Sequence, residues 1–182
     1  MFIGRCTYID NNLSIYGLNG ELSIGRFCSI AGKLILIGGD GYHKKERAST
    51  YPFPLRRPFN NYFLKDDFYN GSSSNNCKTI IGNDVWIGAD VLITKNITVG
   101  NGAIIAAKSV VTKDIPPYAI VAGNPAKLLK YRFEKEKIEI LEKINWWQWP
   151  LDKIINNSDL FQLTNNKLME RLRSLNSIKE VK

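Results

Sequence analysis

The chain has 182 residues, 44% of them hydrophobic, and a formal net charge of +8 at pH 7. This size and composition fit one globular domain and exclude a wholly disordered chain. The longest aliphatic run, residues 34–37, is far too short to cross a bilayer, so we expect no stable membrane insertion. The positive charge suits an anionic partner, but it is spread along the sequence, so we expect no nucleic-acid partner.

The cysteines and the first residues indicate the compartment. Cys6, Cys28 and Cys77 lie far apart and form neither a metal-ligand spacing nor a disulfide framework. The opening residues, MFIGRCTYID, lack the basic region and apolar stretch of a secretory signal. We therefore expect reduced thiols, a cytoplasmic location and no metal requirement.

The N-terminal region repeats aliphatic residues every six positions, in two registers. The first register holds Ile3, Ile9 and Ile15, and the second holds Ile24, Ile30 and Leu36. The slip between the two registers predicts a bulge or short loop near residues 17–22.

Residues 38–79 interrupt this period and contain His43, the only histidine of the chain. The interruption also holds 8 of the 20 aromatic residues: Tyr42, Tyr51, Phe53, Phe59, Tyr62, Phe63, Phe68 and Tyr69. A solvated linker is not this aromatic, and long ordered loops in compact domains are usually functional. We expect the loop to pack against its own domain or against a neighbouring subunit.

The six-residue period then returns in its clearest form. Every sixth residue is Ile or Val at Ile81, Ile87, Ile93, Val99, Ile105 and Val111. Six is not a helical period, and the residue after each of these is small or threonine, which permits a turn. The pattern predicts a β-solenoid in which each hexad is one short strand and a corner, and three hexads close one triangular turn.

A different pattern follows Pro116 and Pro117. Residues 118–127 are extended in character, and residues 132–146 carry a helical stripe. The stripe consists of Ile138, Leu141, Ile144 and Asn145, and is followed by Trp146, Trp147 and Trp149. We expect an amphipathic helix with an aromatic anchor, docked on the solenoid rather than on a membrane because its other faces carry four glutamates. The predicted organisation is a β-domain, residues 1–130 with the inserted loop 38–79, and a helical tail, residues 131–182.

Two stretches carry a resemblance to a known family. The segment IGNDVWIGADVLITKNITVGNGAIIAAKSVVTKDIPPYAIVAGNPAKLLKYRF resembles the hexapeptide-repeat acyltransferases. That family implies an all-β fold, a left-handed parallel β-helix with a long excursion loop and a C-terminal α-helix. The loop segment GYHKKERASTYPF, together with WWQW after the helix, resembles the xenobiotic acetyltransferase branch, which includes type B chloramphenicol and streptogramin acetyltransferases and sugar O-acetyltransferases. The resemblance covers residues 24 to about 155.

The resemblance implies a homotrimer that binds acetyl-CoA in a cleft between neighbouring solenoids. It also implies that His43 is the catalytic base. This role suits the chemistry, because a hydroxyl attacks a thioester well only as its proton is removed, and imidazole accepts protons near neutral pH. The tetrahedral oxyanion needs a donor, for which a backbone N–H of a corner is suited.

The coenzyme-binding residues implied by the resemblance run along the repeats. They are Trp86 at the acyl end, Ala89 and Ala107 beside the pantetheine arm, Thr112 and Lys113 near its far end, and Lys127 and Lys130 at the nucleotide phosphates. Small residues let a thin arm lie close to the backbone, and lysines suit phosphates. Alternatives are a packing role for Trp86 and a solvated surface for the lysines. The chain departs from the family at Lys108, where glycine is common.

The implied reaction is acetyl transfer to a hydroxyl of a sugar or surface-polysaccharide precursor, because ILIGGDGYHKK looks more like the sugar-directed relatives. The alternatives are an antibiotic hydroxyl of chloramphenicol or streptogramin type, a sugar amine, and a non-catalytic solenoid scaffold. A γ-type carbonic anhydrase, which shares the solenoid, is excluded because its zinc site needs several histidines.

Overall fold

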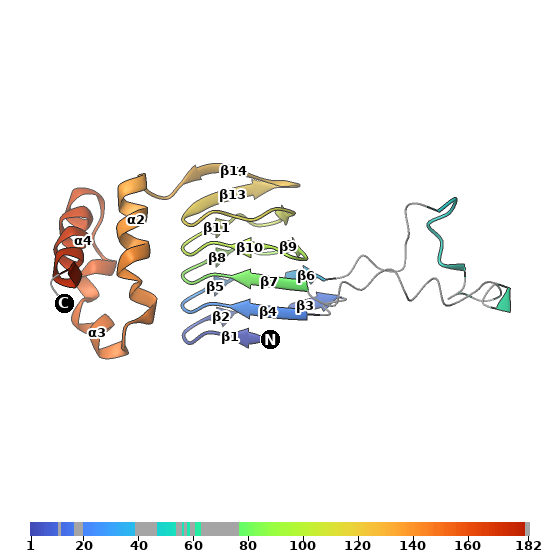
Figure 1. The fold of residues 1–182 in the computed structure, drawn as a ribbon, viewed down its shortest axis with the longest axis horizontal. Helices are drawn as coiled ribbons and strands as arrows, with labels where there is room; N and C mark the ends of the chain where they lie inside the picture. Colours follow the sequence, from blue (N-terminus) through green and yellow to red (C-terminus); the bar gives the residue numbers. More distant parts are fainter. Residues whose placement is uncertain are drawn as a thin grey trace.

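The computed structural model describes residues 1–10, 12–16, 20–38, 47–53, 56, 58, 61–62 and 77–180. His43 and most of the predicted loop 38–79 lie outside these residues. The described part is a stack of short strands with a group of helices on one side (Figure 1).

The strands belong to three sheets. The first contains β1 (Phe2–Ile3), β4 (Gly20–Ile24), β7 (Cys77–Ile81) and β10 (Thr98–Val99). The second contains β2 (Tyr8–Ile9), β5 (Ser29–Ile30), β8 (Trp86–Ile87), β11 (Ile104–Ile105), β13 (Ala119–Gly123) and β14 (Ala126–Tyr131). The third contains β3 (Leu13–Tyr16), β6 (Leu34–Ile37), β9 (Val91–Thr94) and β12 (Val110–Val111). All pairings are parallel except that of β13 with β14.

The chain visits the first, second and third sheets in turn, so three consecutive strands make one turn of the stack. The hexad residues pair across turns: Ile81 with Val99, Ile87 with Ile105 and Ile93 with Val111. These partners are 18 residues apart, as three hexads per turn predicts. All six side chains point inward and are only 0–1% exposed, which confirms the predicted aliphatic column.

The N-terminal turns follow the same plan with a longer spacing. Ile3 pairs with Ile24, and Ile15 pairs with Leu36, each 21 residues along the chain. The two registers noted in the sequence are therefore two successive turns. The slip falls between β3 and β4, where residues 17–19 lie outside the described part.

The corners between the first and second sheets share one backbone conformation. Left-handed φ values of +55 to +65° occur in each turn, at Cys6, Phe27, Asp84, Gly102 and Tyr118. Four of these positions carry a side chain, so the conformation alone does not require glycine. A Cβ at Gly102 would lie 2.5 Å from the Tyr118 ring, and the absence of a side chain there leaves room for this ring.

The C-terminal tail contains more helices than the sequence predicted. It comprises α2 (Lys135–Ile144), η3 (Trp146–Gln148), α3 (Leu151–Asn156), η4 (Ser158–Phe161) and α4 (Asn165–Glu180). α2 corresponds to the predicted amphipathic helix, but Asn145 ends it in the left-handed conformation rather than continuing the stripe. The sequence does not predict the later tail helices, because their apolar residues pack against the other tail helices. These residues therefore do not form a single apolar stripe at helical spacing.

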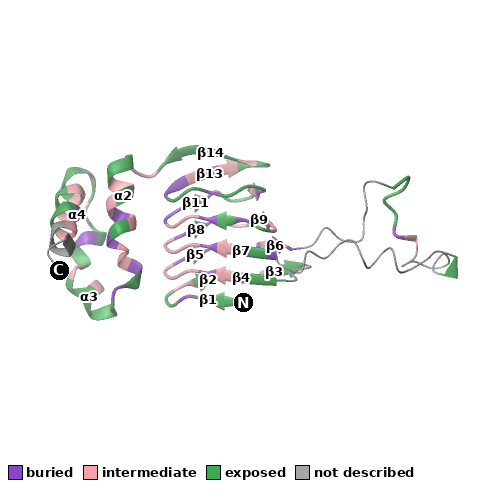
Figure 2. Cartoon of the chain, in the orientation of Figure 1, coloured by how far each residue is buried: buried purple, intermediate pink, exposed green. Residues whose placement is uncertain are grey.

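A second core joins the tail to the stack. Its buried residues are Tyr118, Leu141, Ile144, Trp147, Trp149, Leu160 and Leu172. Phe27 of the stack also packs here, with its ring 5.0 Å from that of Trp146. The expected aromatic anchor and its docking on the stack are thus confirmed, and Figure 2 shows buried segments on the tail side that faces the strands.

Candidate functional site

Trp86 lies on the outer face of the second sheet. Its neighbour Ile87 points into the core, whereas Trp86 is 54% exposed. In register with Trp86, the outer positions of adjacent strands are Ser29 and Ile104. An indole that is half exposed is not needed to fill the interior of this chain, so it is available to a ligand or a neighbouring molecule.

Ala89 and Ala107 occupy the same corner in successive turns, three residues after the paired Trp86 and Ile104. The backbone N–H of Lys108 donates to the carbonyl oxygen of Ala89 at 2.8 Å. A Cβ on Gly88 would lie 2.5 Å from the backbone nitrogen of Ala107, so the two turns are in close contact here. Because Gly88, Ala89 and Ala107 carry little or no side chain, an extended ligand chain could lie close to the backbone at this corner.

Lys108 occupies the left-handed conformation at this corner, with φ +61°. Asp90 has the corresponding position in the preceding turn, with φ +57°. The chain therefore retains the backbone conformation that favours glycine, although it carries a side chain at both positions. Lys108, at the position where glycine is common in the family, thus has a conformation that glycine adopts readily, and its side chain is exposed.

Two of the predicted lysines face one groove near the end of the stack. Lys113 and Lys127 line a groove of about 290 Å³ together with Asp114, and its apolar walls include Val121 and Leu128. Lys113 follows β12 and Lys127 belongs to β14, so the antiparallel return of β14 brings them together. Two ammonium groups and one carboxylate give this groove a net positive charge.

Thr112 and Lys130, which are also predicted coenzyme contacts, do not line that groove. Thr112 is exposed beside Lys113. Lys130 lines a different cavity of about 790 Å³, together with Pro116, Pro117 and Ile138 of α2. The structure therefore groups Lys113 with Lys127 and separates Lys130 from them, while His43 lies outside the described residues.

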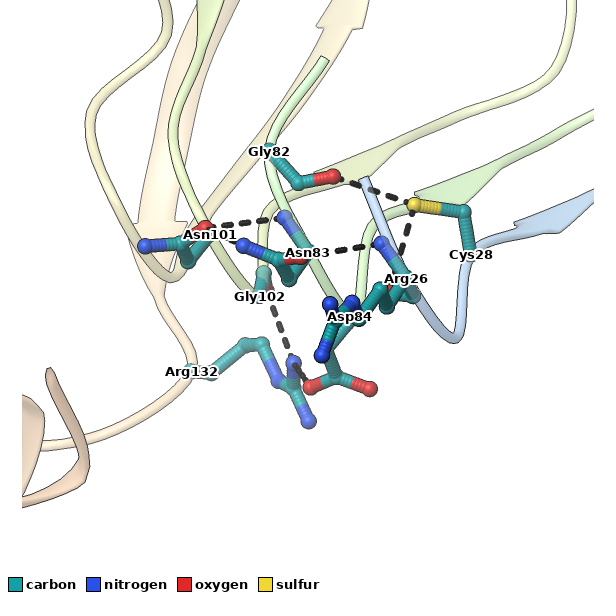
Figure 3. Close-up of polar contacts among 8 residues, drawn as sticks. All are labelled: Arg26, Cys28, Gly82, Asn83, Asp84, Asn101, Gly102 and Arg132. Carbon is teal, nitrogen blue, oxygen red and sulfur yellow. Dashed lines mark hydrogen bonds and ion pairs between the residues drawn. The ribbon is translucent and has the colours of Figure 1, made fainter. Parts of the chain in front are cut away.

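An asparagine ladder at the first-to-second-sheet corner was not predicted from the sequence (Figure 3). The backbone N–H of Arg26 donates to Asn83 Oδ1 at 2.9 Å. Both the backbone N–H and Nδ2 of Asn83 donate to Asn101 Oδ1, at 2.8 and 2.9 Å. Asn101 Nδ2 then donates to Glu142 Oε2 of α2 at 3.1 Å. The ladder thus links three turns of the stack to the tail.

Arg132 closes the same corner from the tail side (Figure 3). Its Nη1 donates to Asp84 Oδ2 at 3.1 Å and to the Gly102 carbonyl oxygen at 2.7 Å. Its guanidinium also lies 5.4 Å from the Tyr118 ring and 5.2 Å from the Phe133 ring. Burial raises the pKa of Asp84, and the Arg132 charge opposes that rise.

The sequence contained a signal for the ladder. Asn83 and Asn101 are 18 residues apart and follow Gly82 and Gly100, so they occupy equivalent positions in successive turns. Their partners Arg132 and Glu142 carried no such signal, because their contacts depend on how the tail docks. We infer that these hydrogen bonds hold the tail against the stack and that this corner is not a reaction centre.

Glu142→Gln is expected to make the protein more stable at neutral pH. Burial raises the pKa of Glu142 above its unfolded-state value, and the hydrogen bond from Asn101 opposes this. The folded state therefore binds the proton more tightly, so the free energy of unfolding falls as pH rises through the raised pKa. Glutamine keeps an acceptor for Asn101 without the charge.

Urea unfolding at several pH values would measure this effect. The variant should lose less stability than the wild type between acidic and neutral pH. Glu139→Gln, on the exposed side of α2, is the matched control and should leave that dependence unchanged. Equal behaviour of the Glu142 variant and the wild type would contradict the role assigned to burial.

No group of three or more His, Cys, Asp or Glu side chains within the described ranges could hold a metal ion. No helix in that part of the chain is long and apolar enough to span a membrane.

Comparisons with known proteins agree with the repeat. Residues 78–113 match the protein family described as "Bacterial transferase hexapeptide (six repeats)". The chain is 38% identical over 179 residues to a probable macrolide acetyltransferase of Lysinibacillus sphaericus, covering 91% of this chain and 89% of that protein. It is 42% identical over 135 residues to a chloramphenicol acetyltransferase of Morganella morganii, covering 74% of this chain but only 62% of that relative.

Two solved structures are similar. One is a hexapeptide-repeat acetyltransferase of Vibrio cholerae O1 biovar eltor complexed with acetyl-coenzyme A, with a TM-score of 0.53 and 28% identity over 72% of this chain and 60% of that one. The other is the polySia-specific acetyltransferase NeuO, with a TM-score of 0.53 and 30% identity over 73% of this chain and 55% of that one. From the repeat and these similarities we conclude that the chain belongs to the hexapeptide-repeat acyltransferases, in the xenobiotic acetyltransferase branch.

Proposed function

We propose that this protein transfers an acetyl group from acetyl-CoA to an acceptor hydroxyl. The observation that carries the proposal is the convergence of Lys113 and Lys127 on one positively charged groove, on the same stack as the exposed Trp86. Coenzyme A has phosphates at one end and a thin arm leading to the thioester, which suits such an arrangement. The proposal gains support from relatives named as acetyltransferases and from the acetyl-CoA complex of a similar structure.

The proposal includes the left-handed sense of the stack and a homotrimer. Three parallel sheets visited in turn, and structural neighbours with hexapeptide repeats, support the left-handed β-helix. In a trimer the coenzyme would lie between neighbouring stacks. Trp86 would then contact the acyl end, and Ala89 and Ala107 the pantetheine arm, with Thr112 and Lys113 beyond it.

In the proposed reaction, His43 removes the proton of the acceptor hydroxyl as its oxygen attacks the thioester carbonyl carbon. The tetrahedral intermediate collapses, the carbon–sulfur bond breaks, and coenzyme A leaves as a thiolate. The imidazolium returns the proton to the thiolate or to water. His43 is proposed for this role on the resemblance of its loop segment to the family.

Two acceptor classes remain within the proposal. Similarity to a probable macrolide acetyltransferase over nine-tenths of the chain, and to a chloramphenicol acetyltransferase, favours an antibiotic hydroxyl. The sugar hydroxyl favoured by the loop sequence has support from the polySia-specific neighbour. We place the antibiotic class first, because its named relatives show the higher sequence identity.

Calorimetric titration with acetyl-CoA tests the proposal without a choice of acceptor. We expect micromolar binding with about one site per subunit, followed by release of free thiol when a panel of antibiotic and sugar acceptors is added. Absence of binding at millimolar coenzyme would reject the enzyme in favour of the non-catalytic scaffold.

Lys127→Glu is expected to weaken acetyl-CoA binding roughly tenfold to a hundredfold. The change removes a cation from the groove shared with Lys113 and adds a charge that repels phosphate. Binding of the acceptor should change far less. Calorimetry with each substrate measures both effects.

Two variants serve as controls for this prediction. Lys167→Glu changes the net charge of the chain equally on exposed α4 and should leave coenzyme binding unchanged. Lys130→Glu alters the other cavity, so it separates the two lysines that the resemblance assigns to the phosphates. Equal losses for acetyl-CoA and acceptor in Lys127→Glu would contradict the phosphate role.

A further inference from the structure

A cavity of about 610 Å³ lies where the tail docks on the first-to-second-sheet corner. From the stack, Asp84 and Tyr118 contribute to its lining. The other walls come from the tail, at positions between residues 132 and 146 and between residues 160 and 168. Cavities of this size are typical of sites that hold small organic molecules. Because the walls come from both parts, the cavity exists only in the docked arrangement of stack and tail.

This cavity is separate from the groove and corners assigned to the coenzyme. Ala89 and Ala107 occupy the second-to-third-sheet corner, and Lys113 follows β12 at the third-to-first-sheet corner. The tail covers the remaining corner, and none of the predicted coenzyme contacts lines the cavity. A molecule bound here would therefore leave the proposed coenzyme site open.

Aromatic rings form much of the apolar wall. Tyr118 and Phe133 have ring centroids 5.8 Å apart, and the rings of Trp146 and Phe161 are 4.8 Å apart. The rest of the apolar lining is leucine, from α2, η4 and α4 and from the residues between the last two. Aromatic walls pack well against another ring, either stacked or edge to face. They therefore favour a ligand with a planar aromatic body.

The charges around the cavity cancel. Its lining includes two carboxylates, Asp84 and Glu134, and two cations, Arg132 and Lys137. Arg132 is already bound to Asp84 (Figure 3), and Lys137 Nζ lies 5.3 Å from the centre of the Phe133 ring. A charged ligand would leave water for a site that supplies no net opposite charge. The cavity therefore favours an uncharged ligand.

Two polar groups of the wall suit a hydroxyl. The Tyr118 hydroxyl has no hydrogen-bond partner among the described residues, although Tyr118 is only 1% exposed. Burial raises the pKa of Tyr118, and the charges of Asp84 and Glu142 add to this, so the hydroxyl keeps its proton. Buried hydroxyls usually have a partner. The Asp84 carboxylate can accept further hydrogen bonds besides that from Arg132, so a ligand hydroxyl has both a donor and an acceptor to pair with.

We propose that this cavity binds a small uncharged molecule that has a planar aromatic body and a hydroxyl group. The aromatic rings and leucines enclose the body, and the hydroxyl pairs with Tyr118 or Asp84. Since both parts of the chain line the cavity, the ligand also holds the tail against the stack. This site does not depend on acetyl transfer or on the proposed trimer.

Equilibrium dialysis of the full chain against 2-naphthol, followed by the fluorescence of this compound, tests the site. We expect saturable binding at one site per chain, with a dissociation constant on the order of 100 μM. 2-Naphthoate adds a negative charge and 2-methoxynaphthalene lacks the donor, so each should bind at least about tenfold more weakly. Absence of saturable binding at millimolar 2-naphthol, or equal affinity for all three compounds, would overturn the proposal.

Variants locate the bound compound. Leu163→Trp narrows the cavity and Phe161→Ala removes one ring of its wall, and each should weaken binding of 2-naphthol at least about tenfold. Ile155→Trp is the matched control, because Ile155 is 68% exposed on α3 and does not line the cavity. Circular dichroism checks that each variant is folded. Wild-type affinity in both cavity variants, or a similar loss in Ile155→Trp, would overturn the proposal.

Acetyl-CoA distinguishes this site from the proposed coenzyme site. Saturating acetyl-CoA should leave the dissociation constant of 2-naphthol unchanged, and Trp86→Ala should do the same, because Trp86 is not part of the cavity. Competition between the two compounds, or loss of 2-naphthol binding in Trp86→Ala, would assign the compound to the coenzyme site and overturn the proposal. A chain that binds 2-naphthol but not acetyl-CoA would reject acetyl transfer and retain this site.

Discussion

His43→Ala is expected to lower turnover about 10²–10⁴-fold, because general-base catalysis contributes on this scale. Without the imidazole, the acceptor hydroxyl must attack the thioester while it still carries its proton. Binding of acetyl-CoA should persist, since the proposed coenzyme contacts come from the repeats and not from this loop. Thiol release under saturating substrates measures the turnover, and calorimetry measures the binding.

Lys44→Ala, one residue along the same loop, is the matched control and should retain most of the activity. The residual activity of His43→Ala should also lose the neutral-pH inflection that a titrating base produces in the wild type. Full activity in His43→Ala would show that the base has been wrongly assigned. Loss of coenzyme binding together with turnover would indicate a structural role for the loop instead.

Asn101→Ala is expected to lower the free energy of unfolding by about 2–4 kcal/mol, because two partly buried donors of Asn83 lose their acceptor and the hydrogen bond to Glu142 is lost as well. Asn101 Oδ1 accepts from both the backbone N–H and the side chain of Asn83, and its Nδ2 donates to Glu142. The change therefore removes the hydrogen bonds to the neighbouring turn and the hydrogen bond to the tail at once. Urea unfolding followed by tryptophan fluorescence measures the loss, because three tryptophans lie in the tail.

Asp114→Ala is the matched control for this prediction. Asp114 Oδ1 accepts from the backbone N–H of Thr98 at 2.7 Å, but this corner is exposed, so water can replace the lost acceptor. The control should lose much less stability than Asn101→Ala. A loss of similar size in both would mean that the asparagine ladder adds nothing beyond a single corner hydrogen bond.

Some contacts could be predicted only in part. The hexads placed Ala89 and Ala107 in the same corner, because parallel stacking with an 18-residue turn fixes which residues lie above one another. The grouping of Lys113 with Lys127 could not be read from spacing, because β14 reverses direction. A register shift between Ile120 and Val121 also changes the alignment along this last strand. Lys127 pairs with Ala122 and Lys130 with Ile120, toward opposite ends of β13, so the two lysines line different cavities although they are close in sequence.

The sequence by itself determined the repeating core. Its inward residues recur at a fixed interval, and each depends on neighbours one turn away, so a local pattern is enough to specify burial and turn length. Tertiary structure alone decided what joins and ends this stack. Arg132 and Glu142 reach Asp84 and Asn101 only once the tail has docked, and the parallel stacking of the second sheet ends only because β14 turns back antiparallel along β13. Such contacts join segments with no shared period, so no local pattern encodes them.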